Sequence, residues 1–187
     1  MSIWGARAAS ELIRRQPNAT TVAAAMARGA AGDACAQQAE EGDYSYKRCA
    51  MFMVWSTGVA FVVDRYIYSH LFAKWFPRTS MKNVWKATLA DNAVVTPFLY
   101  FPAFYLWQGF CDGASPTDSM DKYGNDAVAQ LPMTWAFWVP ANLVTFSIAP
   151  HLRTVWSGAA GTVYIALLSY VTKALEEDTL MSWRGRT

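Results

Sequence analysis

Long stretches without any charged residue constrain this chain more than any other feature. No Asp, Glu, Lys or Arg occurs in residues 92–111, 127–152 or 154–172, and a shorter uncharged run covers residues 49–63. A helix that crosses a bilayer needs about 20 mostly apolar residues. The runs are too long for strands and lack their two-residue alternation. The pattern therefore predicts an all-α fold, a bundle of membrane-spanning helices.

The composition supports this prediction. The chain has 187 residues, of which 53% are hydrophobic and 16% are charged, whereas a soluble domain usually has about 25% charged residues. So little charge argues against a soluble monomer, and so much apolar material excludes a disordered chain. The net charge of +2, without a basic stripe, argues against a nucleic-acid partner. We expect membrane lipids around most of the chain.

We expect four or five spans in a single integral membrane domain over residues 1–187. The least apolar candidate is alanine-rich and contains Arg28 and Asp33. Prolines in or beside the runs are compatible with spans, because neighbouring helices can satisfy the carbonyls that proline frees. Residues 1–16 form either an amphipathic targeting or surface helix or a simple lead-in to the first span. The expected spans are residues 17–39, 49–71, 88–111, 131–150 and 154–172, followed by a polar tail at 173–187.

Charges between the runs alternate in sign along the chain. The N-terminal stretch, residues 64–86 and Arg153 are net positive, whereas residues 40–48 and 112–126 are net negative. A spanning bundle places successive loops on opposite sides of the membrane. By the positive-inside rule, the loops richer in Lys and Arg lie on the cytoplasmic side or its equivalent in an organelle. The pattern places the N-terminus on the positive side.

An ordered series of motifs resembles the Mpv-type family of small membrane proteins, which includes peroxisomal and mitochondrial inner-membrane members. The first part of the series is Trp4, Pro17 with Thr20, and Gly32-Asp33 followed by Gln37. The second part is Asp91-Asn92 followed by Pro97. The third part is Trp138, Asn142, Thr145, Phe146, Pro150 and Arg153, closed by Tyr164 with Leu167-Leu168-Ser169.

This resemblance implies an integral helical fold over nearly the whole chain. It also implies an organelle membrane, most simply the mitochondrial inner membrane and otherwise the peroxisomal membrane. For some family members it implies a small-solute channel. Several polar family positions are exchanged here, such as Asn142 where the family has Gln.

Polar residues inside the expected spans are candidates for function. A charge at membrane depth costs about 3 kcal/mol or more, so it normally faces protein or water and pairs. Arg28 and Asp33 are five residues apart and cannot pair well on one helix, so we expect at least one to pair with another span, for example Arg28 with Asp91. The polar residues either line a pore or clamp the helices in register: Arg28, Asp33, Gln37, Asp91, Asn92 and Asn142.

Small residues at a spacing of four predict close helix contacts, either within the chain or with a partner. In lipid, packing drives helix association, and small residues let two backbones approach. The candidates are Ala23, Ala27 and Ala31, and likewise Ser157 and Gly161.

Signals of an enzyme are missing from the sequence. His70 and His151 have no metal-ligand spacing, the cysteines form no CxxC pair, and no nucleophile or phosphate-loop motif occurs. We therefore expect no catalytic residue, metal or cofactor and no identifiable small-molecule substrate. Two functions remain open: a structural or accessory subunit of a larger mitochondrial inner-membrane complex of the respiratory-chain type, or a small-solute channel in organelle membrane homeostasis.

Overall fold

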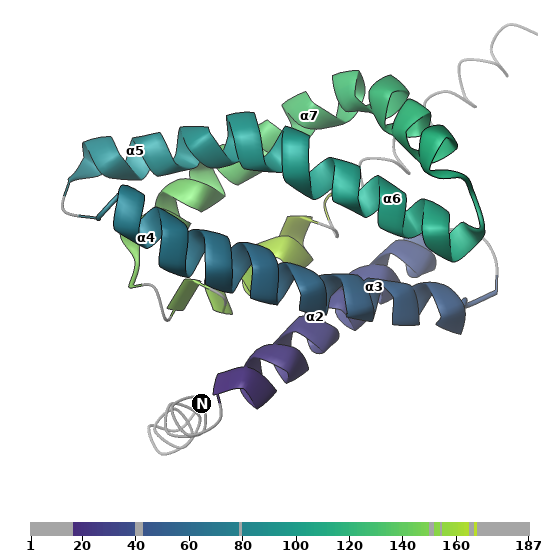
Figure 1. Cartoon of the computed structure of the whole chain (residues 1–187). Helices are drawn as coiled ribbons and strands as arrows, with labels where there is room; N and C mark the ends of the chain where they lie inside the picture. The colour runs from purple at the N-terminus through teal and green to yellow at the C-terminus, as the bar shows by residue number, and fades with distance from the viewer. Residues whose placement is uncertain are drawn as a thin grey trace, which may run out of the picture. The chain divides into compact units, whose positions relative to one another are not determined.

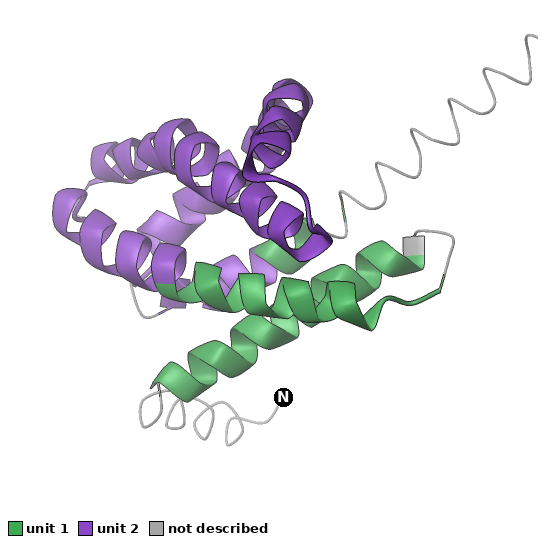
Figure 2. Cartoon of the chain, turned by 45° about the vertical axis from the view of Figure 1, so that its right-hand side comes forward, with its two compact units in different colours: residues 1–61, 161–187 green, residues 62–160 purple. Residues whose placement is uncertain are grey.

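The computed structural model describes residues 17–39, 43–78, 80–149, 152–153, 155–164 and 167. The regular structure of these residues is helical, without a strand, which confirms the predicted all-α class. The chain divides into two compact units, residues 1–61 with 161–187 (unit 1) and residues 62–160 (unit 2), coloured separately in Figure 2. The single domain expected over residues 1–187 stays a prediction beside this division.

Unit 1 is built on two helices, α2 (Pro17–Ala39) and α3 (Tyr46–Val59). Proline suits the first turn of α2, where its missing N–H needs no partner. Ser45 caps α3, because its side chain accepts a hydrogen bond from the backbone N–H of Arg48. The two helices pack against each other and cross at an angle (Figure 1).

The helix that begins with α3 continues without a break through a π-helical segment, η1 (Ala60–Leu71), and α4 (Phe72–Trp75). Within the described part of the chain, this is the one helix long and apolar enough, by length and composition, to cross a membrane; it covers Tyr46–Trp75. It contains the expected span 49–71. Among the described residues, no other helix is both long enough and apolar enough to meet the same test, so the crossing of a membrane by the other expected spans stays a prediction.

A second long helical run lies in unit 2. It consists of α5 (Met81–Ala90), the π-helical η2 (Asp91–Tyr100) and α6 (Phe101–Asp112), and Figure 1 shows it bent between α5 and α6. Proline and π-helical turns are the usual causes of such bends. The run ends at Gly113, whose φ of +76° is a left-handed conformation that glycine adopts without a steric cost.

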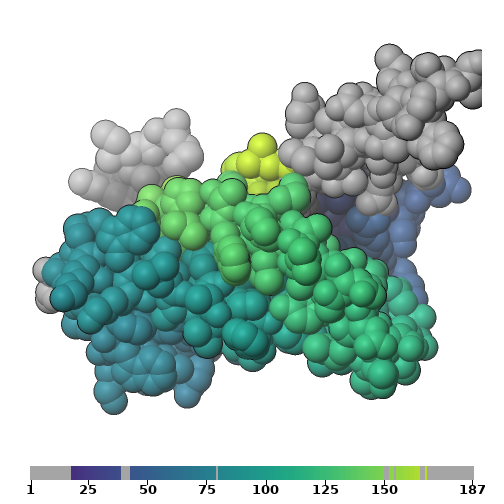
Figure 3. Space-filling view, turned by 90° about the horizontal axis from the view of Figure 1, so that it is seen from above, coloured from purple at the N-terminus to yellow at the C-terminus, as the bar shows by residue number. Residues whose placement is uncertain are grey.

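The longest helix of unit 2 is α7 (Pro116–Ser147), which packs on α5, η2 and α6. Ser115 caps it by accepting from the N–H of Asp118. The space-filling view in Figure 3 shows α7 beside the α5–α6 run. The expectation that residues 112–126 form a loop was wrong, because a serine cap followed by proline starts a helix there.

Each of the other expected spans overlaps a helix of the structure. The range 17–39 coincides with α2, 88–111 lies inside the α5–α6 run, and 131–150 is the last part of α7, which ends at Ser147. Residues 155–164, within the expected span 154–172, are helical. The expected lead-in helix at 1–16 and the tail at 173–187 lie outside the described residues.

The prolines of the bent run leave two carbonyls that α7 satisfies. In the π-helical register, an N–H bonds to the carbonyl five residues earlier, so Pro97 leaves the carbonyl of Asn92 without its donor and Pro102 leaves that of Pro97. The indole N–H of Trp135 donates to the Asn92 carbonyl at 2.8 Å, and the hydroxyl of Tyr123 donates to the Pro97 carbonyl at 2.7 Å. This confirms that a neighbouring helix satisfies carbonyls freed by proline.

Candidate functional site

A buried polar cluster in unit 2 surrounds the carboxylate of Asp91, which is 2% exposed. The hydroxyl of Tyr68, in η1, donates to Oδ1 at 2.7 Å, and Nδ2 of Asn142, in α7, donates to Oδ2 at 2.6 Å. One carboxylate therefore joins three helical segments that are far apart in the sequence. Hydrogen bonds between side chains of different helices hold those helices together, so this arrangement fixes the segments in one register.

The helical segments α5, η2 and α7 contain buried oxygens that have no hydrogen-bond partner. They are Oγ1 of Thr88, Oδ1 of Asn92 and Oδ1 of Asn142. The amide nitrogen of Asn92 is engaged, because it donates to the carbonyl of Thr88 at 2.9 Å. A buried acceptor without a donor costs free energy, so these oxygens mark places where a water molecule or another donor would bind favourably.

Arg153 lies beside the same cluster and is also 2% exposed. Its Nη1 donates to the backbone carbonyl of Tyr68, and its guanidinium carbon lies 5.5 Å from the centre of the Phe146 ring. Phe146 in turn meets the Tyr68 ring edge-on at 5.1 Å. Burial, together with the positive charge of Arg78, lowers the pKa of the Arg153 guanidinium from its ordinary value.

Unit 1 has a polar cluster of its own around Asp33, which is buried between α2 and α3. Nε of Arg48 lies 2.9 Å from Oδ1 of Asp33, an ion pair whose geometry is not that of a hydrogen bond. Gln37 donates to Oδ2 of Asp33 and to the Ser45 carbonyl and accepts from the Ser45 N–H. These contacts tie the end of α2 to the start of α3.

The expected interhelix pairing of a charged residue in α2 is therefore present. Asp33 pairs with Arg48 of α3, and Nη2 of Arg28 donates to the Ser56 carbonyl of α3 at 3.0 Å. Arg28 belongs to unit 1 and Asp91 to unit 2, so the particular pair of Arg28 with Asp91 stays a prediction.

The six polar candidates thus separate into two groups. Arg28, Asp33 and Gln37 lie in unit 1, whereas Asp91, Asn92 and Asn142 lie in unit 2. Most of their polar atoms contact other side chains or backbone groups of their own unit. A continuous path lined by both groups stays a prediction.

The small residues expected at a helix contact have mixed positions. Ala23, Ala27 and Ala31 are exposed on α2, so the packing of α2 on α3 does not pass through them. It passes through Gly29, where an added Cβ would lie 2.5 Å from the Phe52 carbonyl oxygen. A contact of the three alanines with a partner stays a prediction.

The second expected pair of small residues lies in the helix at 155–164. Ser157 is buried, and an added Cβ at Gly161 would lie 3.5 Å from Cδ of Arg28, an ordinary contact. The close approach expected at Gly161 therefore leaves room for a methyl group.

Most of the motif residues that carry the family resemblance lie within the described helices. Gly32 is buried in α2, Pro97 lies in η2, Trp138 is half-buried in α7 and Phe146 packs against Tyr68. Trp4 and Pro150 lie outside the described residues. Pro17 begins α2.

Sequence reasoning missed Tyr68 and Arg48, the partners of the two buried carboxylates. Both partners come from another helix, and sequence spacing carries no signal for contacts of that range. For the segment 17–39 a signal was available, because glycine at 29 and 32 indicates which face allows a close approach.

Within the described ranges, no group of three or more His, Cys, Asp or Glu residues is placed to hold a metal ion. Comparison of the chain with protein-family models, with curated protein sequences and with solved structures gives no match.

Proposed function

We propose that this protein is an integral membrane protein with four or five helical spans. The observation that supports this most is the distribution of residues in unit 2. Charged and amide side chains such as Asp64, Asp91 and Asn142 are buried, whereas large apolar ones such as Phe98 and Phe110, each 76% exposed, face outward. Water favours the opposite distribution, and a surrounding apolar medium of lipid or partner helices accounts for it.

Within the membrane, we propose a structural role and no catalytic one. Asp33 is engaged by Arg48 and Gln37, and Asp91 is engaged by Tyr68 and Asn142. Polar contacts of this kind hold helices in register, whereas a pore needs polar groups that face a water-filled path. The contacts support the clamp interpretation.

The protein then acts as an accessory subunit in a larger membrane assembly. The exposed apolar side chains provide surface for lipids and for helices of other subunits, and aromatic residues such as Trp85 and Phe98 suit such contacts. The resemblance to the Mpv-type family supports an organelle membrane, and we propose the mitochondrial inner membrane, with the peroxisomal membrane as the second choice.

A small-solute channel is the alternative. The unpartnered buried oxygens of Thr88, Asn92 and Asn142 favour it, because such groups are where water would enter unit 2. A channel would leave these oxygens hydrated along a continuous path.

Extraction from the native membrane in a mild detergent, followed by native sizing, tests the proposal. An accessory subunit co-migrates with a complex much larger than its own 20.8 kDa, and cross-linking captures that complex's subunits at exposed α6 positions such as Phe110. Migration as a small free oligomer that conducts solutes in reconstituted bilayers contradicts the subunit role and supports the channel.

A further inference from the structure

Arg153 is a buried cation without a counter-ion among the described residues. Its contacts are the backbone carbonyl of Tyr68 and the face of Phe146. Its Nε atom is closed to solvent and has no hydrogen-bond partner. A buried charge is costly unless it is paired and hydrogen-bonded, and a carbonyl with an aromatic ring leaves the positive charge uncompensated.

The free edge of the Arg153 guanidinium indicates which kind of ligand it can bind. Nη1 is occupied by the carbonyl of Tyr68, which leaves the edge formed by Nε and Nη2. This edge presents two parallel N–H groups that match two oxygens of one anion. The unpartnered Nε therefore lies on the edge that arginine uses to hold a phosphate or carboxylate group.

A second cation belongs to the same compact unit. Arg78 is exposed, in the turn between α4 and α5, and its positive charge acts on the Arg153 guanidinium. Like charges repel each other, and an anion bound by both arginines relieves that repulsion. The turn is held in place by Asn83, whose Nδ2 donates to the Pro77 carbonyl at 2.9 Å.

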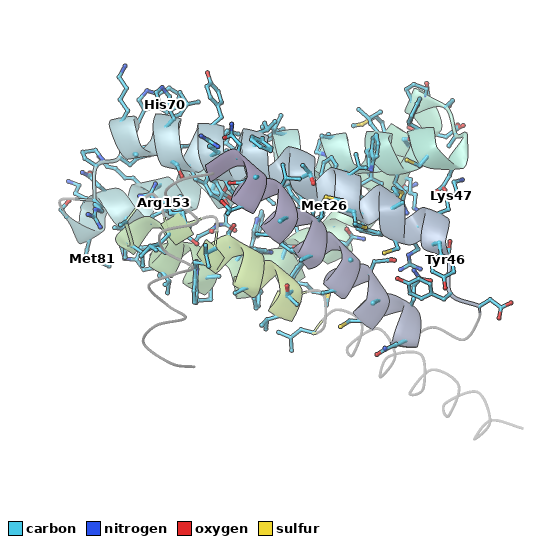
Figure 4. The ribbon with its side chains drawn as sticks, turned by 90° about the horizontal axis from the view of Figure 1, so that it is seen from below. Met26, Tyr46, Lys47, His70, Met81 and Arg153 are labelled. Atoms are coloured by element: carbon cyan, nitrogen blue, oxygen red, sulfur yellow. The ribbon has the colours of Figure 1, made fainter. Side chains whose placement is uncertain are left out.

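We infer that Arg153 and Arg78 form a binding site for a phosphate group, carried either by a lipid headgroup or by a free phosphate. Arg153, labelled in Figure 4, supplies the paired N–H edge, and the exposed Arg78 meets the anion first. The loop charges expected from the sequence place both arginines on the positive side of the membrane. A phosphate-bearing headgroup would lie at that level.

The variants that test the site separate charge from geometry. Arg153→Lys keeps the charge but loses the paired edge, and Arg78→Gln removes the exposed cation. Lys122→Gln is the control, because it also removes one positive charge but lies near the start of α7, whereas Arg153 follows the end of that helix. About 35 Å of helix separate that position from the end of α7.

Two measurements on the full-length protein in detergent distinguish the sources of phosphate. Thermal unfolding is followed with inorganic phosphate against chloride at equal ionic strength, and again with phosphatidylcholine against phosphatidylcholine containing phosphatidic acid. A response to inorganic phosphate supports a site for free phosphate, and a response to phosphatidic acid alone supports a headgroup site.

In either case, Arg153→Lys and Arg78→Gln should each weaken binding roughly tenfold, as expected for one lost hydrogen bond to a charged group, while Lys122→Gln binds as the native protein does. No response to either phosphate source overturns the inference. Equal losses in all three variants overturn it as well, because they would show unspecific attraction to positive charge. If Arg153→Lys fails to fold, Arg78→Gln at the surface decides the outcome.

Discussion

The contact of α2 with α3 makes the sharpest prediction of the structure, at Gly29. A Cβ added there would lie 2.5 Å from the carbonyl oxygen of Phe52 and 2.8 Å from Cα of Met53. Both are backbone atoms, so no change of rotamer relieves the clash. In Gly29→Ala the two helices have to move apart, and this also strains the nearby ion pair of Asp33 with Arg48.

The magnitude follows from two opposing effects. Overpacking of a close contact costs about 1–3 kcal/mol, whereas alanine in place of glycine inside a helix contributes about 1 kcal/mol of stability. Since the clash is with backbone, we expect Gly29→Ala to lose about 1–2 kcal/mol. Gly58→Ala in α3 is the matched control, because its added Cβ meets nothing within 4 Å, so it should gain up to about 1 kcal/mol.

Denaturant unfolding of the full-length protein in mixed micelles, followed by circular dichroism, measures both variants. The structure requires opposite signs for the two substitutions. If Gly29→Ala is as stable as Gly58→Ala, the close approach of α2 and α3 at this position is refuted.

Two further substitutions test unit 2 in the same assay. Tyr123→Phe leaves the Pro97 carbonyl without its donor and should cost about 1 kcal/mol of stability. Tyr66→Phe is the control, because among the described residues the hydroxyl of Tyr66 has no hydrogen-bond partner. If the two variants have the same free energy of unfolding, the hydrogen bond of Tyr123 does not contribute to stability. Asn142→Ala removes a donor to buried Asp91 and should cost about 1–3 kcal/mol. Exposed Asn125, in the same helix, should tolerate alanine within about 0.5 kcal/mol, and equal effects at Asn125 and Asn142 would contradict the clamp.

The helical class and most helix positions could be predicted from the sequence, because a long uncharged run indicates a segment that is buried in protein or surrounded by lipid. The α2 boundaries matched residues 17–39. The start of α7 was misplaced because the aspartates at 118 and 121 suggested a loop, although Ser115 and Pro116 are a helix-start signal. The charged residues belong to the first turns of α7, and their charge was taken as evidence against a helix.

The candidate site could be predicted only in part. Asp33, Asp91 and Asn142 stood out because polar residues are costly within apolar runs. Their partners Arg48 and Tyr68 could not be identified, because the contact depends on how the helices cross. The same holds for Trp135 and Tyr123, whose role depends on a π-helical register that no residue pattern specified.

The account rests on lipid facing the apolar exterior of unit 2, and spin-label accessibility tests that most directly. Nitroxides are attached after Phe98→Cys, within the expected span 88–111, and after Lys82→Cys, outside it, in protein reconstituted into bilayers. The native cysteines are first replaced: Cys35, Cys49 and Cys111. We predict that the label at 98 collides more with oxygen, which dissolves in lipid, and the label at 82 more with a water-soluble nickel complex. Higher nickel than oxygen accessibility at position 98 would contradict the membrane assignment.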